Sequence, residues 1–213
     1  MDNSLRPPLP KVIEIFDSAE KAWKVAGDLP RNLIAWKSGP RLTLGTAFSG
    51  GYFYCLMSWA EEIDDMHEYT EGIMGFNMLE RTSIFVPVPN LDQFSYFYQL
   101  LACGSRILYV VGSSNQVTIW EVNKDAATNW RELVFMPQAV YEVFTNMPGV
   151  RREKFTCAGM GNWLYFRKHR VNQVAVYNLT QNSWTLLSSC PTVAVPSDPP
   201  LIVFKPNVHM KVS

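Results

Sequence analysis

The sequence has no excess of charge of either sign and no long hydrophobic run. Lysine plus arginine and aspartate plus glutamate both number 19, so the formal net charge is zero. A nucleic-acid-binding domain would carry a clear basic excess. No apolar run approaches the roughly 18 residues of a transmembrane helix, and the first residues lack the hydrophobic segment of a signal peptide. We therefore expect no nucleic-acid partner, no membrane and a cytoplasmic or nuclear location.

The sequence also lacks the motifs that would indicate catalysis or a metal site. Its four cysteines form no C-x-x-C pair, which favours reduced, buried thiols. The histidines His67, His169 and His209 have no partners at ligand spacing. There is no Gly-x-Ser-x-Gly elbow, and Gly-Met-Gly at 159–161 is half of a dinucleotide fingerprint and fits a turn better. We expect no enzyme activity, no cofactor and no metal.

Apolar residues are abundant and arranged as hairpins. They make up 47% of the chain, and aromatics make up 13%, which is enough for a folded core. In VAVYNLTQNSWTLLSSCP, residues 174–191, an alternating strand leads through the turn residues 180–183 to a second apolar run that starts at Trp184. Pro191 ends that run, because proline cannot donate to a sheet ladder.

The same hairpin pattern recurs three more times. Residues 11–30 repeat it with Trp23, and residues 117–137 repeat it with Trp130 and three extra residues expected in the turn. A degraded copy, residues 72–89, has Phe85 at the tryptophan position. In the three tryptophan copies, a proline follows the tryptophan seven positions later.

A second type of hairpin precedes three of these copies. Residues 97–112 and 152–167 each contain an apolar strand, a cysteine, a glycine-containing turn and another apolar strand. Residues 45–59 supply a Gly-Gly turn at the corresponding place. The glycines that mark these turns are Gly50, Gly51 and Gly104. Each complete unit therefore has four short strands.

Four-stranded units repeated every 45–62 residues are typical of a β-propeller. The aromatic markers Trp23, Phe85, Trp130 and Trp184 would fill the wedge between neighbouring blades, and glycine turns would sit where strands crowd together. The predicted propeller region is 11–207, with an extended N-terminus, 1–10, and a tail, 208–213. Its predicted parts are a partial blade 11–30, blades 43–89, 95–137 and 152–191, and a closing strand 200–207.

The pattern of apolar strand, Tyr/Phe-Asp/Asn, turn, Trp and Pro resembles the kelch repeat. Residues 127–144, KFTCAGMGNWLYF and residues 174–191 resemble the C-terminal half of plant F-box/kelch-repeat proteins, and residues 200–211 resemble their closing strand. The resemblance covers nearly the whole chain from Lys11. It implies an all-β fold, a partial kelch-type β-propeller with about three four-stranded blades plus a hairpin fragment.

The resemblance also implies a function. Such a propeller would bind a target protein for ubiquitination as the substrate-recognition region of a Skp1–cullin–F-box ubiquitin ligase, without chemistry of its own. No helical F-box pattern precedes Lys11, so Skp1 is expected as a partner only if an F-box lies upstream. A stand-alone interaction scaffold is the alternative. A copper oxidase on the kelch scaffold is a second one, but the sequence lacks paired histidines.

Blade topology predicts where a target would bind. In an antiparallel four-stranded blade, the connection between the second and third strands and the connection to the next blade emerge at the same rim. The acidic stretch 60–72 is expected there as a loop, with the connections 112–116, 167–173 and 138–151. The candidate binding residues are Trp36, Tyr96, Tyr141, Phe144, Arg151, Arg152, Arg167 and Arg170. For each aromatic residue among them, the alternative to a binding role is packing in the wedge between blades.

Overall fold

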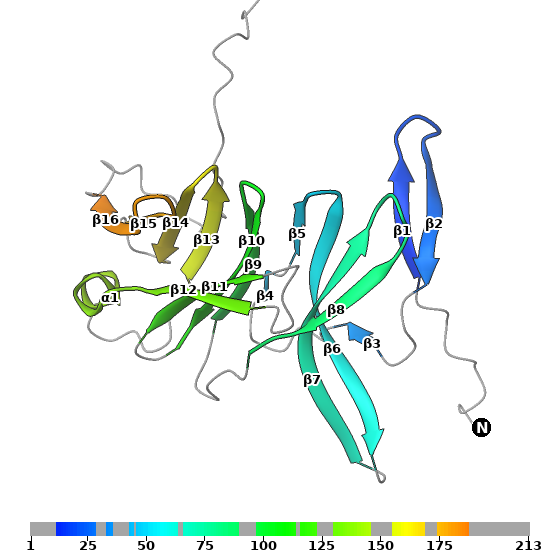
Figure 1. Cartoon of the computed structure of the whole chain (residues 1–213), viewed down its shortest axis with the longest axis horizontal. Helices are drawn as coiled ribbons and strands as arrows, with labels where there is room; N and C mark the ends of the chain where they lie inside the picture. The colour runs from blue at the N-terminus through cyan, green and yellow to red at the C-terminus, as the bar shows by residue number, and fades with distance from the viewer. Residues whose placement is uncertain are drawn as a thin grey trace, which may run out of the picture. The chain divides into compact units, whose positions relative to one another are not determined.

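The structure is a computed structural model of the 213-residue chain. The residues that it describes are 12–28, 33–35, 43–44, 46–63, 66–89, 97–113, 116–122, 130–145, 155–168 and 174–187. Their secondary structure is almost entirely antiparallel β-sheet, with one short helix, so the predicted all-β class is confirmed (Figure 1). The four-stranded sheets resemble propeller blades. The predicted closing strand 200–207 lies outside the described residues.

The chain forms two compact units. Unit 1 comprises residues 1–37 and 51–88, and unit 2 comprises residues 38–50 and 89–213. The division at Gly50–Gly51 falls inside the predicted blade 43–89. Each unit is described below by itself.

Unit 1 contains a hairpin and a separate antiparallel sheet. Strands β1 (Val12–Asp17) and β2 (Ala22–Asp28) pair as the predicted partial blade. The sheet has the order β3-β6-β7-β8, with β3 (Leu33–Ala35), β6 (Tyr52–Ile63), β7 (Met66–Asn77) and β8 (Ser83–Pro87). Ile13 of the hairpin packs against Met57 and Met74 of the sheet.

The acidic stretch 60–72 is not the loop that we predicted. Strands β6 and β7 continue through it, with Glu61 paired to Glu68 and Ile63 paired to Met66. Only residues 64 and 65 separate the two strands. In this part of the sheet, β6 and β7 pair only with each other, because the pairing with β3 and β8 ends before it. It is therefore a two-stranded extension of the sheet. We had interpreted this stretch as a loop because of its many acidic residues.

Unit 2 contains two four-stranded antiparallel sheets that correspond to the predicted blades 95–137 and 152–191. The first has the order β9 (Phe97–Cys103), β10 (Arg106–Gly112), β11 (Val117–Val122) and β12 (Trp130–Phe135). The second has the order β13 (Phe155–Met160), β14 (Trp163–Lys168), β15 (Val174–Asn178) and β16 (Ser183–Leu187). Strand β4 (Thr43–Leu44) adds to β9 in parallel, and β5 (Thr46–Ser49) contacts β9 and β10.

The main hydrophobic core of unit 2 lies between these two sheets. It joins Leu108 and Val110 of the first sheet to Leu164 and Phe166 of the second, all with almost no exposed surface. Strands β9 and β13 lie next to each other along one side of this core (Figure 1). Alternating apolar residues on both sheets thus produce a stacked pair of sheets, as expected for neighbouring blades.

The predicted turn glycines have the backbone conformation that makes glycine necessary. Gly50 and Gly51 have φ of 58° and 80°, and Gly104 has φ of 63°. Gly161 occupies the same place in the β13–β14 turn, with φ of 60°. These positive φ values are costly for residues with a Cβ, so each turn depends on its glycine.

The hairpins of the other type share one turn geometry in three copies. Asp17, Asn77 and Asn178 each accept hydrogen bonds through Oδ1 from the backbone N–H groups two and three residues later, at 2.9–3.2 Å. The residue four positions later has a positive φ in each copy. These residues are Lys21, Arg81 and Asn182. Identical turns at three places strengthen the case for an internal repeat.

The strand register corrects two details of the repeat. Trp23 pairs with Phe16 and Trp184 pairs with Tyr177, the residues just before the turn. In the second copy, the residue at that place pairs with Ser83, and Phe85 lies two residues further along β8. The predicted equivalence of Phe85 to the tryptophans is therefore wrong by two residues.

The expected three-residue insertion before Trp130 is also too large. Trp130 pairs with Val122, which leaves seven residues between the two, against six between Phe16 and Trp23. The register thus places one extra residue in the turn, and a β-bulge after Ile119 adds another in β12. Counting from Glu121 overstated the insertion, because Glu121 lies two positions before the counterpart of Asp17.

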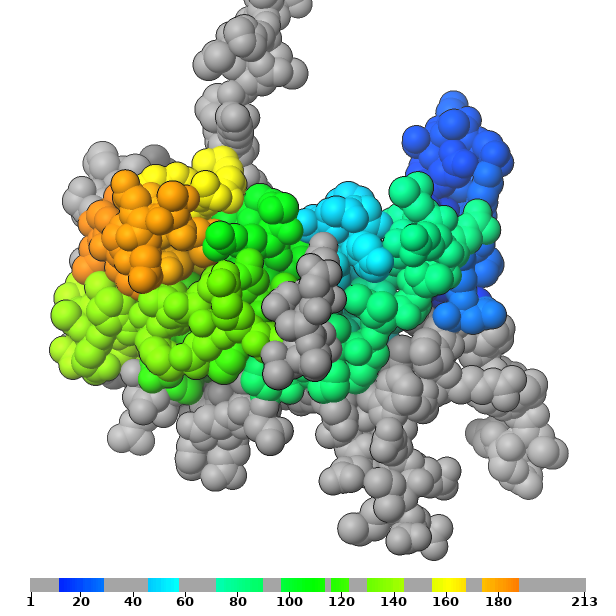
Figure 2. All heavy atoms as spheres, in the orientation of Figure 1, coloured from blue at the N-terminus to red at the C-terminus, as the bar shows by residue number. Residues whose placement is uncertain are grey.

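The connection that begins after Pro137 contains a helix that we did not predict. Helix α1 (Gln138–Thr145) starts where the Pro137 carbonyl accepts hydrogen bonds from the N–H groups of Val140 and Tyr141, both at 2.9 Å. Figure 2 shows its atoms directly against those of β15 and β16. The segment 138–151 is therefore not a plain connecting loop.

Candidate protein-binding rim

The two sheets of unit 2 are aligned so that their equivalent ends lie together. At one end, an added Cβ at Gly104 would lie 3.2 Å from the carbonyl oxygen of Gly161, so the two glycine turns are neighbours. At the other end, a Cβ at Gly112 would lie 2.7 Å from the ring of Phe155. The end with Gly112 carries the connections β10–β11 and β14–β15. We call this end the connection rim of unit 2.

A hydrogen bond joins the two kinds of connection that we expected to share a rim. The hydroxyl of Tyr141 in α1 donates to the carbonyl of Ser113, at 3.1 Å. Ser113 begins the β10–β11 connection and is held by its N–H donating to the carbonyl of Gln116, at 2.8 Å. The structure therefore brings segments 112–116 and 138–145 together at the connection rim.

Tyr141 packs in the core and is not an exposed binding residue. Only 6% of its surface is exposed, and its ring belongs to the core cluster between the two sheets. Of its two predicted roles, packing is the one that its burial supports. Phe144 lies in α1, but its side chain is outside the described residues. Trp36, Tyr96, Arg151, Arg152 and Arg170 also lie outside the part of the chain that the structure describes.

Arg167 lies at the connection rim as predicted. It is near the end of β14, paired with Thr156 on one side and Val174 on the other, and its side chain is partly exposed. Its guanidinium is permanently charged and presents five donors in a fixed geometry, which suits a carboxylate or a peptide carbonyl. Arg167 is the one candidate arginine within the described residues.

Sequence reasoning missed the exposed side of α1. Gln138 and Glu142 are exposed and joined by a hydrogen bond of 2.9 Å, and Val143 is a half-exposed apolar residue beside them. The signal was present in the sequence, because Val140, Tyr141 and Phe144 follow the spacing of one helix face. Helix α1 therefore adds polar and apolar contact residues to the connection rim.

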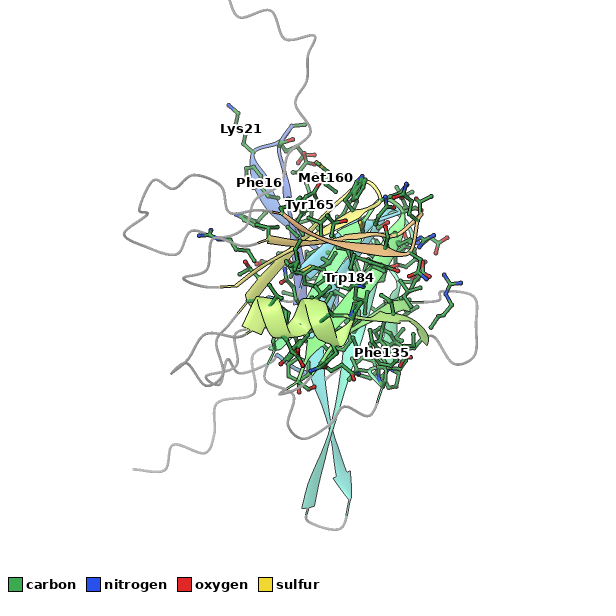
Figure 3. The ribbon with its side chains drawn as sticks, turned by 90° about the vertical axis from the view of Figure 1, so that its left-hand side faces the viewer. Phe16, Lys21, Phe135, Met160, Tyr165 and Trp184 are labelled. Atoms are coloured by element: carbon green, nitrogen blue, oxygen red, sulfur yellow. The ribbon has the colours of Figure 1, made fainter. Side chains whose placement is uncertain are left out.

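The marker tryptophan of the last sheet lies on the face of its sheet that is turned toward the core. Trp184 packs against the core between the two sheets, with its ring centroid 4.9 Å from Tyr177 and 5.2 Å from Phe166. In Figure 3 it lies between the β16 ribbon and α1. Its indole Nε1 is buried and has no hydrogen-bond partner. Trp184 is thus a packing residue.

The other markers differ in their burial. Trp130 is partly buried, with its ring centroid 5.5 Å from Tyr109 of its own sheet. Phe85 is partly buried and packs against the Met57–Met74 cluster. Trp23 is 67% exposed and contacts Phe16, at 5.5 Å between centroids. Wedge packing therefore does not describe Trp23 within unit 1.

The three cysteines of the described residues are not activated as nucleophiles. Burial raises the pKa of the Cys55 and Cys103 thiols to about 11, and raises that of Cys157 further above its ordinary value. These thiols are protonated at neutral pH and are poor nucleophiles. Among the described residues, no three His, Cys, Asp or Glu side chains are placed to hold a metal ion.

No protein-family model matches the chain, and no curated protein matches its sequence. In the described residues, no helix has the length and apolar character needed to cross a membrane.

Proposed function

We propose that the protein is a non-catalytic, kelch-type binding module that holds a target protein at the connection rim of unit 2. It acts as the substrate-recognition region of a Skp1–cullin–F-box ubiquitin ligase, in the cytoplasm or nucleus. The proposal combines the resemblance of the repeat to plant F-box/kelch-repeat proteins with the geometry of unit 2.

One observation carries the proposal: the Tyr141–Ser113 hydrogen bond fastens two connecting segments together at one end of a stacked pair of sheets. Rigid sheets that present clustered connections are a common basis for binding sites. The exposed residues at this end are of mixed character, with Arg167, Glu142 and Val143. Mixed polar and apolar surface is typical of a protein–protein contact.

Protein capture tests the rim. The tagged chain is expressed in cells with and without a proteasome inhibitor, and captured proteins are quantified by mass spectrometry. A target for ubiquitination accumulates with the inhibitor and is captured by the wild-type chain. The double change Arg167→Glu and Val143→Glu should reduce its capture by at least about tenfold, because both residues lie at the connection rim.

A matched control lies at the opposite end of the same sheet. Gln181 is exposed in the β15–β16 turn, and Gln181→Glu adds negative charge while keeping an acceptor for Asn178 Nδ2. This variant should capture the target as well as the wild type does. Equal capture by the rim variant would show that binding does not use this rim.

Coupling to a ligase needs a separate measurement. If the gene encodes an F-box upstream, the product that contains it should co-purify Skp1 and a cullin together with the target. Target capture without Skp1 by that product would leave the stand-alone scaffold as the function. Copper-dependent oxidase activity would contradict both.

A further inference from the structure

The β1–β2 hairpin has one apolar face that unit 1 does not cover. Phe16, Trp23 and Val25 are all exposed there, and Phe16 and Trp23 are in ring contact. The register places Glu14 on the same face, opposite Val25. The opposite face is occupied, since Ile13 packs against the Met57–Met74 cluster. We call residues 14, 16, 23 and 25 the Trp23 face.

The last sheet of the chain has the same face, but covered. Trp184 pairs with Tyr177 just as Trp23 pairs with Phe16, after the same type of turn. Sheet β9–β12 covers this face through Cys103, Leu108 and Val110, which share its core, and α1 lies beside Trp184 itself. The structure therefore contains a direct example of what a tryptophan face of this kind binds: the flat side of another four-stranded sheet.

Sheet β13–β16 has a second apolar face, on the side away from Trp184. Figure 3 shows Met160 and Tyr165 on that side of the sheet. Strand pairing places Trp163, Val174 and Leu187 with them, and Trp163 and Leu187 are 40% and 45% exposed. Arg167 pairs with Val174 and lies on the same side, and we call these six residues the outer face of β13–β16.

Five residues of the outer face match the surface that covers Trp184, whereas Trp163 corresponds to Arg106, which is not part of that core. Counted from the glycine turns, Met160 corresponds to Cys103, Tyr165 to Leu108 and Arg167 to Val110. The same registers relate Val174 to Ile119 and Leu187 to Val134. All five counterparts belong to the core between the sheets or pack against it.

We propose that the outer face of β13–β16 in one copy of the chain binds the Trp23 face of a second copy, head to tail. The contact reproduces the packing of β9–β12 on β13–β16, with two exposed apolar faces covering each other. It shares Arg167 with the connection rim, so it is tested below with variants of Trp23 and Tyr165, which are not among the rim residues.

The charged residues of the two faces are complementary. In the existing interface, Ala175 occupies the place of Glu14, and Val110 occupies the place of Arg167. Both are fully buried in the shared core. Glu14 of one copy and Arg167 of the other would therefore both lie within the new contact, with opposite charges. Two like faces would instead bring Glu14 near Glu14, which favours the head-to-tail arrangement.

Mass measurements on the purified full chain test the contact. Light scattering after size-exclusion chromatography should give a mass above the 24.3 kDa monomer, decreasing on dilution. Trp23→Glu and Tyr165→Glu should each weaken association by about thirtyfold or more, because each places a charge at the centre of one face. A wild-type chain that stays monomeric at all concentrations would overturn the proposal.

Mixing the two variants distinguishes head-to-tail contact from contact between like faces. Each variant keeps one working face, so an equimolar mixture should form a heterodimer with twice the 24.3 kDa mass and no larger species. If both variants are monomeric and the mixture is too, or if Tyr165→Glu alone still associates like the wild type, the head-to-tail contact is wrong.

Leu79→Glu is the matched control. Leu79 is 89% exposed at the tip of the β7–β8 turn and lies on neither face. This variant should associate like the wild type, and circular dichroism should show the same β signal for all three variants. Loss of association in Leu79→Glu would mean that added charge alone prevents it, and would overturn the assignment of the faces.

Discussion

The side chain of Gln99 hydrogen-bonds to the backbone of an edge strand in the neighbouring sheet. Its amide Oε1 accepts from the N–H of Cys157 at 2.8 Å, and its Nε2 donates to the carbonyl of the same residue. Cys157 lies in β13, the edge strand of its sheet, and Gln99 is buried in β9 of the other sheet. One glutamine therefore satisfies two backbone groups that would otherwise be buried without partners.

Gln99→Leu should destabilise unit 2 by about 2–4 kcal/mol, because it leaves a buried N–H and a buried C=O unsatisfied. Urea unfolding measures the change. Gln138→Leu is the control, since Gln138 makes a similar amide hydrogen bond, to Glu142, but at the exposed surface of α1. It should change stability by less than about 0.5 kcal/mol. Equal effects of the two changes would contradict the role of Gln99.

The buried thiols predict a dependence of stability and reactivity on pH. Burial raises the pKa of Cys55 and Cys103 to about 11, whereas an unfolded thiol has a pKa near 8.5. Their contribution to stability is therefore complete below about pH 8.5 and is lost as pH rises toward about 11.

Thiol modification with Ellman's reagent checks this. In a Cys190→Ser chain at about pH 8, the folded protein should react slowly, and urea should release three fast-reacting thiols. Cys190 is replaced because it lies outside the described residues. Fast reaction of any thiol in the folded chain would contradict the raised pKa values of the three cysteines.

At the scale of single residues, the backbone conformation could be predicted from the sequence more reliably than the burial of a side chain. Gly50, Gly51 and Gly104 have the positive φ values expected for turn glycines, because that requirement is local. Tyr141 was predicted to be a candidate binding residue. It is buried, because it lies in a helix that we did not predict and that packs on the core. Trp23 has the repeat pattern of Trp184 and a different exposure, since burial depends on which sheet lies beside it.

At the scale of elements, the Asx turn is the repeated unit. Its last residue is left-handed in all three copies, and only in one of them is it asparagine, which tolerates that conformation. Lys21, with φ of 54°, and Arg81, with φ of 56°, carry side chains that disfavour it.

Lys21→Gly should stabilise unit 1 by about 1 kcal/mol, because glycine adopts a positive φ without the Cβ clash. The midpoint of urea unfolding checks this, with hydrogen exchange of the β1–β2 amides as the local measure. Ala19→Gly in the same turn is the control, since Ala19 has no positive φ and the change only adds flexibility to the unfolded chain. It should lower stability by about 0.4–1 kcal/mol. A loss of stability in Lys21→Gly would contradict the strain at this turn.

Most strands could be predicted, and the exceptions have physical reasons. Alternation and turn residues located the strands of blades 95–137 and 152–191, because these features act over a few residues. The extension of β6 and β7 through residues 60–71 was missed, since acidic residues are rare in strands and favour a loop interpretation. Helix α1 has eight residues, too few for its periodicity to stand out beside the surrounding strands.

At the scale of the molecule, the spacing between the two sheets of unit 2 depends on small residues. A Cβ added to Gly159 of β13 would lie 2.6 Å from the carbonyl oxygen of Ala102 and 2.9 Å from Leu101 Cδ1, both in β9. Real Cβ atoms do not approach a backbone oxygen so closely, so the sheets would have to separate. This would loosen the core that they share, including the contacts of Trp184.

Gly159→Ala should therefore destabilise unit 2 by about 1–3 kcal/mol and leave unit 1 less affected, because the clash lies between two sheets of one unit. Hydrogen exchange followed by mass spectrometry should show faster exchange across β9–β16 than in the wild type, with β6–β8 unchanged. Gly161→Ala provides the comparison: a Cβ there meets nothing within 4 Å, so its cost comes only from the φ of 60°. That cost should be about 1 kcal/mol and confined to the β13–β14 turn. If Gly159→Ala also affected only its own hairpin, the two sheets would not be unfolding as one body.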